Sequence, residues 1–559
     1  GLALLFSLLI TGIGTLVFLY TSYYLKGHTY LDRFYGYLSI FMAAMLGLVL
    51  SDNLIGIFVF WELTSISSFF LIGFNNHDKE SRTSALQALA VTGFGGLFLL
   101  GAAIVFGYLG GTYSIQELLN SGIDFTESPF YILLLVFVFG AAFTKSAQFP
   151  FHFWLPGAMK APTPVSTYLH SATMVKAGIY LLLRFTPVLG NHEFWNTTLF
   201  TVGAVTMLYA AFHTLFRTDL KGILAYSTIS VLGILVFLIG IGTTTALHAA
   251  VVFIVVHALY KAALFLITGI IDHETGTRNI TKLSGLKAVL FPVAIAGFLA
   301  MLSNAGMIPS FGFIGKDLIY EATLHSDSSV LFTAMAVVTN ILLLYAGYQV
   351  GIRPFVGKLP ESFASVHLPD KRLWVPPLFL GILGILFGLF PSLLDTALFQ
   401  PLLNELVVAD TIPPLKLWHG FTLVLLLSLL TIGLGLALVW FLKPTLAKEL
   451  KLKKVNFLAP KYLFRGFANG FQKAASLWTN FFQNGFLRNY ILTIILFLSF
   501  LISYYLINNV TFSIDFNSLL DLTIYEVSTL VIMIVAIFYA IFTKSRLAAV
   551  AAMGVVGYA

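Results

Sequence analysis

The chain has 559 residues, of which 58% are hydrophobic and 10% are charged, whereas a soluble domain has about 25% charged residues. This composition and a mean hydropathy of +0.92 exclude a soluble globular protein and predict an all-α polytopic membrane protein. The net charge of +7 lies mostly in short loops between apolar stretches, so it indicates membrane orientation and no nucleic-acid partner. The sequence contains no cysteine, which excludes thiolate-held iron–sulfur clusters and disulfides within the chain.

Apolar runs of about 20 residues predict about fifteen transmembrane crossings. Two of these runs, 129–160 and 287–324, are too long for one straight helix and contain Pro150 and Pro309, so each predicts a broken helix. Residue 1 is glycine and the chain ends in an apolar run, so we expect both ends to be cuts through a longer polypeptide. The crossings lie at 1–25, 34–50, 52–74, 84–109, 129–160, 163–186, 198–216, 222–241, 245–271, 287–324, 329–350, 374–396, 416–442, 488–508 and 524–543.

Loop charge orients these crossings. One side of the predicted membrane carries most of the basic residues, and we expect this side to be cytoplasmic. The loop 110–128 on the other side carries only acidic charges, and this asymmetry continues along the chain only if 129–160 and 287–324 each cross once. The basic loop residues are Lys26, Arg33, Lys79, Arg82, Arg217, Lys221, Arg278, Lys282 and Lys287.

The crossings then form two groups. Residues 34–186 are predicted to form a first five-helix repeat and 198–350 a second, inverted one, each with a broken fourth helix. Corresponding broken helices in inverted repeats indicate a transport site at the repeat interface, although simple kinks in packed helices are the alternative. The other predicted parts are an N-terminal transmembrane segment at 1–33, two additional helices at 374–442, a basic amphipathic cytoplasmic-side segment at 443–487, and truncated C-terminal helices at 488–559.

Five ionisable residues occur inside apolar stretches, where each costs several kcal/mol. Such a set predicts a pathway for protons, or for ions exchanged for them. Glu62 and Lys145 are expected to form a pair in which the carboxylate controls the proton occupancy of the lysine; a static buried ion pair is the alternative. The five residues are Glu62, Lys145, Lys176, Lys261 and Lys316.

Histidines extend this predicted pathway. His257 lies four residues before Lys261, so the two share a helix face, and histidine titrates near neutral pH. His170 and Lys176 form a similar but weaker pairing, and packing is the alternative role for each histidine. Lys221 begins a predicted span, where snorkelling to the lipid interface competes with a role in the pathway.

The sequence indicates neither catalysis nor a cofactor. The histidines have no spacing that demands haem, and no Gly-rich phosphate loop of the Walker type occurs. Sodium requires several oxygen ligands, and no carboxylate cluster locates a metal site. We therefore predict a secondary transporter subunit, not an enzyme, with no catalytic residue, no cofactor and a metal site that stays unknown.

The segment 443–490 differs from the predicted spans. It is strongly basic, with Glu449 as its one acid, and large apolar residues recur in it at helical spacing. This pattern predicts an amphipathic helix along the cytoplasmic surface, either as a membrane anchor or against partner subunits. The recurring residues are Phe464, Phe467, Phe471, Ala475, Trp478 and Phe482.

Short motifs between about residues 34 and 350 resemble those of the antiporter-like subunits shared by respiratory complex I and Mrp-type cation/proton antiporters. The resemblance implies that Glu62 and Lys145 are the family's glutamate–lysine pair and that Lys316 is the lysine of the second broken helix. It also makes His170, Lys221, His257 and Lys261 candidates for a central hydrophilic axis. The motifs are Trp61-Glu-Leu-Thr-Ser, Leu71-Ile-Gly-Phe, Lys145-Ser-Ala-Gln-Phe-Pro, Trp154-Leu-Pro, Ala161-Pro-Thr-Pro-Val-Ser, His170-Ser-Ala-Thr-Met-Val, Leu224-Ala-Tyr-Ser-Thr, His257-Ala-Leu-Tyr-Lys-Ala and Gly312-Phe-Ile-Gly-Lys-Asp.

Gly93 and Gly96 distinguish two branches of this family. Large complex I subunits usually place an arginine and an aspartate at these positions, whereas the glycines, together with Trp61-Glu-Leu-Thr, look like the large A subunits of Mrp sodium/proton antiporters. The closing run 546–558 looks like the start of the extra C-terminal membrane part of those subunits.

The resemblance implies a proton-translocating subunit that exchanges Na+ for H+ in the cell membrane of a prokaryote and serves pH and sodium homeostasis. The implied partners are other membrane subunits, including a second antiporter-like one. Two alternatives stay open: a proton-pumping antiporter-like subunit of complex I or a related membrane-bound redox complex, and a scaffold whose charges are structural.

Overall fold

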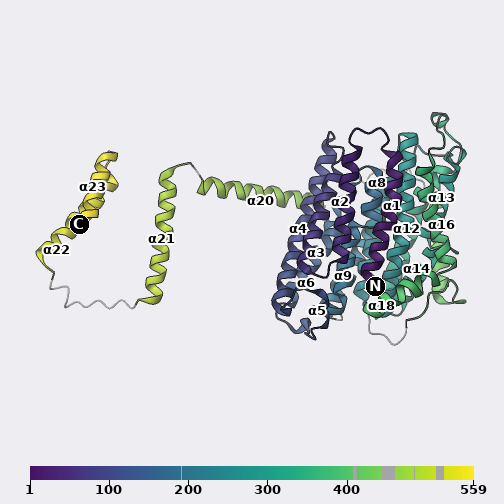
Figure 1. Cartoon of the computed structure of the whole chain (residues 1–559), viewed down its shortest axis with the longest axis horizontal. Helices are drawn as coiled ribbons and strands as arrows, with labels where there is room; N and C mark the ends of the chain where they lie inside the picture. Colours follow the sequence, from purple (N-terminus) through teal and green to yellow (C-terminus); the bar gives the residue numbers. More distant parts are fainter. Residues whose placement is uncertain (191, 407–411, 443–459, 484, 511–521) are drawn as a thin grey trace. The chain divides into compact units, whose positions relative to one another are not determined.

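The computed structural model describes residues 1–190, 192–406, 412–442, 460–483, 485–510 and 522–559. The chain divides into two units, Gly1–Phe464 and Arg465–Ala559. The first unit is a bundle of long helices that run side by side (Figure 1). In the described residues the regular structure is helical, with two isolated β-bridges.

The helices follow the predicted apolar runs closely. Among the described residues, twelve helical stretches are long and apolar enough to cross a membrane, and α6, α13 and α23 are shorter apolar helices. The predicted all-α membrane fold is therefore confirmed. The α-helices up to residue 241 are α1 (Leu2–Tyr24), α2 (Leu31–Leu50), α3 (Leu54–Ile72), α4 (Lys79–Gly110), α5 (Ile115–Asn120), α6 (Tyr131–Lys145), α7 (Trp154–Ala158), α8 (Thr163–Ser171), α9 (Ala177–Leu189), α10 (Glu193–Thr214) and α11 (Leu220–Ile241).

The later helices include several short elements in the connections. The α-helices are α12 (Thr244–Thr275), α13 (Phe291–Ala305), α14 (Phe311–Leu324), α15 (Ser329–Gly351), α16 (Lys371–Leu389), α17 (Ser392–Leu394), α18 (Gln400–Leu406), α19 (Leu423–Phe441), α20 (Pro460–Phe482), α21 (Leu487–Asn509), α22 (Ile524–Phe542) and α23 (Arg546–Tyr558). The 3-10 helices are η1 (Phe125–Glu127), η2 (Phe151–Phe153), η3 (Met174–Lys176), η4 (Leu286–Ala288), η5 (Arg353–Phe355) and η6 (Glu361–Phe363), and η7 (Asp395–Phe399) is a π-helix.

Two helices form the interior of the first unit. In the most apolar stretch of α12, 100% of the residues are buried, and in that of α11 the share is 89%. In the corresponding stretch of α4 only 44% of the residues are buried. A helix that is apolar all round belongs in an interior, and α12 packs against α8, α11, α13, α14 and α16. Lys221 on α11 and His257 and Lys261 on α12 therefore lie inside protein and not against lipid.

Both predicted helix breaks occur. Helix α6 ends at Lys145, and an irregular stretch containing Pro150 precedes η2 and α7; α13 ends at Ala305, and α14 begins two residues after Pro309. The peptide bonds before Pro150 and Pro309 are cis. Each break leaves backbone groups without helical partners, and such a break is tolerated at membrane depth only where protein or a wet cavity surrounds it.

A third interruption was not predicted. The crossing expected as one span at 163–186 divides into α8, η3 and α9. Here hydroxyl groups bond to the backbone: Ser171 Oγ donates to the carbonyl of Thr167 at 2.5 Å, and Thr173 Oγ1 donates to that of Tyr168 at 2.6 Å. Such local bonds compete with the helical hydrogen-bond pattern, and they accompany a break at which no proline lies.

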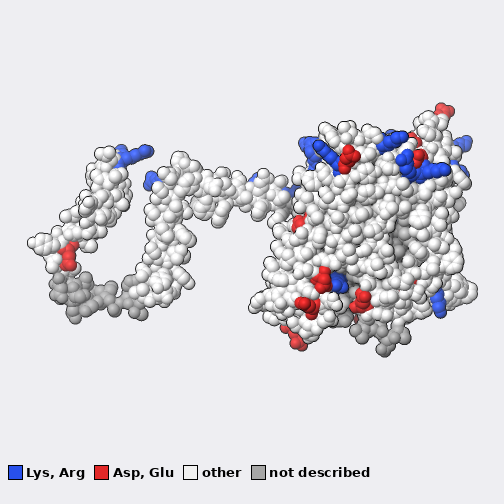
Figure 2. Space-filling model, viewed as in Figure 1, with Lys and Arg blue, Asp and Glu red and all other residues white. Residues whose placement is uncertain are grey.

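Other differences lie at element ends. The span predicted at 416–442 is helical from Leu423, and the span predicted at 374–396 ends as a helix at Leu389. The predicted amphipathic segment is helical over α20, while its part at 443–459 lies outside the described residues. Figure 2 shows most lysine and arginine side chains of this face of the bundle at its upper end, with a few acids among them, and acidic side chains prevailing at its lower end.

Candidate functional site

Lys145 is the last residue of α6 and is completely buried. Its Nζ donates to Ser65 Oγ at 2.8 Å and to the backbone carbonyl of Trp61 at 3.2 Å, both on α3. The same atom lies 5.1 Å from the centroid of the Trp61 ring. These contacts are all to uncharged groups, so Lys145 is held in place without a bonded carboxylate.

The Glu62 carboxylate packs against α4 and not against the atoms that bond to Lys145. Trp61 and Ser65 are four residues apart and share one face of α3, whereas the Glu62 carboxylate contacts Gly96 on α4. The described residues contain no ion pair between Glu62 and Lys145, and Glu62 Oε1 is buried without a hydrogen-bond partner among them. The two groups therefore interact electrostatically without a direct ion pair, and the control of Lys145 by Glu62 stays a prediction.

The break after Lys145 is fixed by hydrogen bonds to neighbouring segments. Ser146 Oγ donates to the carbonyl of Val175 at 2.7 Å, and Trp154 Nε1 donates to the carbonyl of Thr144 at 2.9 Å. The backbone N–H of Phe149 donates to Thr206 Oγ1 on α10 at 3.0 Å. Side chains thus form hydrogen bonds with some of the backbone groups that the break leaves unpaired. The bond from Ser146 also links the break to η3, the segment that carries Lys176.

Lys176 and His170 lie on either side of the unpredicted interruption. Lys176 is completely buried in η3, and its Nζ donates to the carbonyl of Ile254 on α12 at 2.8 Å. His170 is also completely buried, and neither ring nitrogen has a hydrogen-bond partner among the described residues. A histidine without a partner has a free donor and acceptor for a proton or a water molecule.

The α12 helix brings His257 and Lys261 to the same region. Lys261 Nζ donates to Ser227 Oγ on α11 at 2.7 Å, and both ring nitrogens of His257 are buried without a hydrogen-bond partner among the described residues. Lys176 interacts electrostatically with Lys261 and with His257. These three basic groups come from η3 and α12 and form one cluster.

Lys221 points into the protein. Only 2% of its surface is exposed, and its Nζ donates to the carbonyl of Ala161 at 2.9 Å, just before α8. Snorkelling to lipid, the alternative expected from its position at the start of a span, does not describe this side chain. Lys221 is the charged group that interacts with His170, so these two residues form a second basic pair.

Lys316 lies in α14, directly after the second break. It is buried, and its Nζ has no hydrogen-bond partner among the described residues. The aliphatic part of the side chain lies against Gly306, which ends α13 with a φ of +69°. The glycine therefore serves both the sharp turn of the break and the placement of Lys316.

Replacing Gly306 by alanine is expected to lower the thermal stability of the protein by more than the equivalent change at Gly276. Both glycines follow a helix with a left-handed φ, +69° and +68°, which costs an alanine about 1 kcal/mol. A Cβ at Gly276 meets nothing within 4 Å, whereas one at Gly306 meets the Lys316 side chain. The melting temperatures of the two purified variants test this; equal losses would show that Gly306 makes no contact that matters with Lys316.

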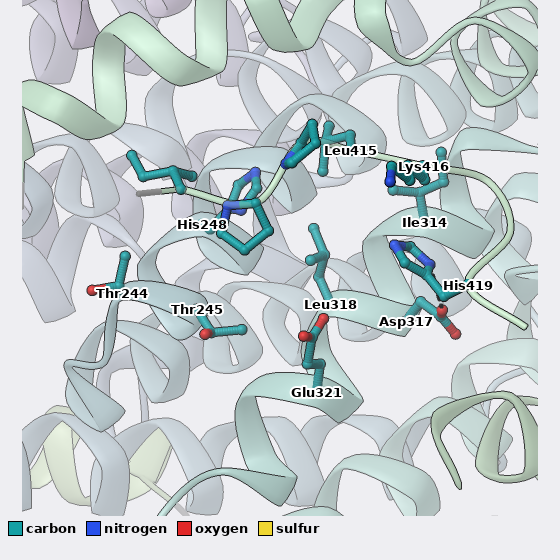
Figure 3. A pocket seen from close by; sticks show the side chains of 13 residues that line it. Thr244, Thr245, His248, Ile314, Asp317, Leu318, Glu321, Leu415, Lys416 and His419 are labelled. Atoms are coloured by element: carbon teal, nitrogen blue, oxygen red, sulfur yellow. Dashed lines mark ion pairs between the residues drawn. The ribbon is translucent and has the colours of Figure 1, made fainter. Parts of the chain in front are cut away.

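A small cavity next to Lys316 was not predicted from the sequence. It has a volume of 110 Å³ and is lined by apolar and polar side chains of α12, α14 and the segment before α19 (Figure 3). Asp317 accepts a hydrogen bond from Ser428 Oγ at 3.1 Å and lies 3.9 Å from His419 Nδ1, and Figure 3 shows Glu321 and His248 on other walls. The signal in the sequence was Lys316-Asp317 itself, but His419 is distant in the chain and gave none.

The structure thus brings the expected residues together as neighbouring clusters on packed elements. The break after Lys145 is hydrogen-bonded to η3, whose Lys176 lies with His257 and Lys261. Lys221 and His170 interact with each other on the neighbouring helices α11 and α8, and α12 packs against α14, which carries Lys316. Among the described residues, no group of three or more His, Asp or Glu side chains is arranged to hold a metal ion. The fold and these residues define a polytopic membrane protein whose broken helices and interior helices carry buried basic side chains.

The chain belongs to the NADH:quinone oxidoreductase/Mrp antiporter transmembrane family, whose sequence model matches residues 51–343. It is 38% identical to the A1 subunit of a Na(+)/H(+) antiporter from Staphylococcus haemolyticus, covering 100% of this chain and 72% of the relative. It is 36% identical to the A subunit of a Na(+)/H(+) antiporter from Alkalihalophilus pseudofirmus, covering 100% and 73%. A solved chain of the Mrp complex from Dietzia sp. matches with a TM-score of 0.83 and 34% identity over 100% of this chain and 60% of that one.

Proposed function

We propose that this chain is the proton-translocating part of a multisubunit sodium/proton antiporter. The observation that carries the proposal is a set of five lysines, none more than 3% exposed and none with an ion-pair partner among the described residues. Burying an ammonium ion without a counter-ion costs several kcal/mol of folding free energy. Such a residue inside a membrane protein therefore indicates a functional role. The five are Lys145, Lys176, Lys221, Lys261 and Lys316.

The geometry supports a relay in which protonation moves from one basic cluster to the next. Lys145, Lys176, Lys221 and Lys261 donate only to hydroxyl or carbonyl oxygens, so a proton can leave each without breaking an ion pair. Like charges close together in a low dielectric repel, so a proton arriving at Lys176 disfavours one at Lys261. His257 and His170 have free ring nitrogens with which to pass protons, directly or through water.

Glu62 acts in this relay as a movable counter-charge. Its carboxylate attracts the proton on Lys145 from a distance and is not bonded to it, so a rotation of Glu62 toward or away from α6 changes how strongly Lys145 keeps that proton. This motion is a form of the control of Lys145 by Glu62 that the sequence predicts, and it differs from the static ion pair that was the alternative.

The relatives name sodium and protons as the exchanged ions, and we extend that exchange to this chain. We propose the cell membrane of a prokaryote as the location and other membrane subunits as partners, one of which is a second antiporter-like subunit. The basic end of the bundle is proposed to face the cytoplasm. The inverted relation of the repeats at 34–186 and 198–350 is part of the same proposal, and the sodium pathway is not assigned to residues.

Reconstituted complex carrying Lys316→Ala is expected to lose most of its sodium-driven proton movement, while Lys287→Ala is expected to keep it. Lys316 is buried at the second break and Lys287 is exposed in a loop, so both variants remove one lysine but only the first removes a relay group. Proton release from vesicles after a pulse of external sodium, with no electron donor present, is the measurement. Proton movement that requires a quinone reaction would favour the redox complex instead.

A further inference from the structure

A second cavity lies at the end of the bundle where α2 begins, α3 ends and α4 begins, and none of the five buried lysines lines it. Its volume is 420 Å³. Its rim consists of polar residues of the helix ends and the α3–α4 loop, and its wall consists of aromatic and aliphatic residues of the three helices. The lining residues used below are Tyr30, Arg33, Tyr37, Phe70, Arg82 and Leu86.

The rim carries two cations and no carboxylate. Arg33 stacks over the Tyr30 ring with its guanidinium carbon 5.0 Å from the ring centroid. Arg82 uses one nitrogen, Nη1, to donate to the carbonyls of Asn76 and His77. No acidic residue lines the cavity, and neither arginine forms an ion pair among the described residues. Two unneutralised guanidinium groups at one opening favour an anion, most of all a phosphate.

The wall is apolar and lies about one helical turn deeper along the same helices. Tyr37 follows Arg33 by four residues, and Leu86 follows Arg82 by four, a rise of about 6 Å. Tyr37 stacks on Phe70 with ring centroids 5.0 Å apart, while Phe70 is 43% exposed and Leu86 is 58% exposed. The cations therefore lie at the helix ends, and an open apolar wall follows along the span. This arrangement matches an amphiphile whose charged end is at the water interface.

We propose that this cavity binds an anionic phospholipid, with Arg33 and Arg82 on the phosphate and an acyl chain along Tyr37, Phe70 and Leu86. Basic pockets at membrane–water boundaries bind lipid head groups in this way. A protein partner fits less well, because a standard protein interface takes about 20–30 residues on each side and this cavity offers a dozen. The inference does not depend on proton movement by the chain.

The test is photo-crosslinking of the intact, detergent-solubilised complex with photoactivatable phosphatidylglycerol, and with photoactivatable phosphatidylcholine in parallel. Phosphatidylglycerol is expected to label peptides of α2, α3 or α4 at this cavity several-fold more than phosphatidylcholine. Arg33→Gln/Arg82→Gln is expected to lower that labelling several-fold. The matched control is Lys282→Gln/Lys287→Gln, which removes two exposed charges that do not line the cavity and should label like wild type.

Because Arg82 also holds the α3–α4 loop, a second variant keeps both arginines. Leu86→Trp fills the acyl wall from an exposed position and is expected to reduce labelling as well. Equal labelling by the two lipids, unchanged labelling in both variants, or an absence of labelling because another protein of the complex covers the cavity would overturn the proposal. Displacement of phosphatidylglycerol by inorganic phosphate would assign the cavity to a soluble anion and would overturn it too.

Discussion

Complex carrying Lys145→Gln is expected to lose nearly all sodium-driven proton movement while it assembles and unfolds like wild type. The glutamine side chain is nearly as long as that of lysine. Its amide keeps an N–H donor for Ser65 Oγ and the Trp61 carbonyl, the two partners of Lys145 Nζ. It cannot take up or release a proton at neutral pH. The variant therefore separates the structural contacts of Lys145 from its proton chemistry, which an alanine variant, leaving both partners unsatisfied, would not do.

Lys160→Gln is the matched control for this experiment. Lys160 lies between α7 and α8, its side chain is 45% exposed, and it pairs with the exposed Glu80. Exposed ion pairs contribute about 0–1 kcal/mol, so this variant should assemble normally and transport at close to the wild-type rate. If Lys145→Gln instead retained transport in a normally assembled complex, the buried charges would be structural and the scaffold hypothesis would be correct.

The membrane fold was predictable because its signal is coarse. A span needs only a long apolar run, and the ends of α3, α11 and α15 lie close to those predicted from such runs. The breaks at Pro150 and Pro309 were predictable for a different reason, since proline removes a backbone donor and clashes with the preceding turn. The interruption between α8 and α9 was missed because it depends on hydroxyl groups that bond to the backbone, and Ser and Thr also occur in unbroken helices such as α3.

The candidate site was predictable in its members but not in its pairings. Burial of Lys145, Lys261 and Lys316 follows from their place in apolar runs, and all are at most 3% exposed. Which group each lysine contacts depends on helix rotation, which a sequence pattern does not determine. Ser65, one turn beyond Glu62, receives the hydrogen bond from Lys145, while Glu62 interacts with Lys145 electrostatically. His419 was missed because it lies about a hundred residues from Asp317 in the sequence, and no periodic pattern indicates that the two side chains are neighbours.

Gly96→Ala is expected to reduce sodium-driven proton movement by roughly an order of magnitude or more without destabilising the protein. A Cβ at Gly96 would overlap the Glu62 carboxylate. The obstacle is the far end of a flexible side chain, so Glu62 can rotate away at little cost in stability, and alanine raises helix propensity by about 1 kcal/mol. The carboxylate then leaves the position from which it acts on Lys145, and proton transfer depends steeply on such geometry.

Gly93→Ala is the control that isolates this effect. Gly93 lies one turn earlier on the same helix, and a Cβ there would meet Glu62 Oε2 at 3.8 Å, an ordinary contact. Both variants add one methyl group to α4, so they should share any gain in helix stability and differ only in where Glu62 is placed. Sodium-driven proton release and melting temperature are measured on both. Equal activity in the two variants would mean that the position of the Glu62 carboxylate does not control the relay, and that the space kept open by Gly96 serves packing alone.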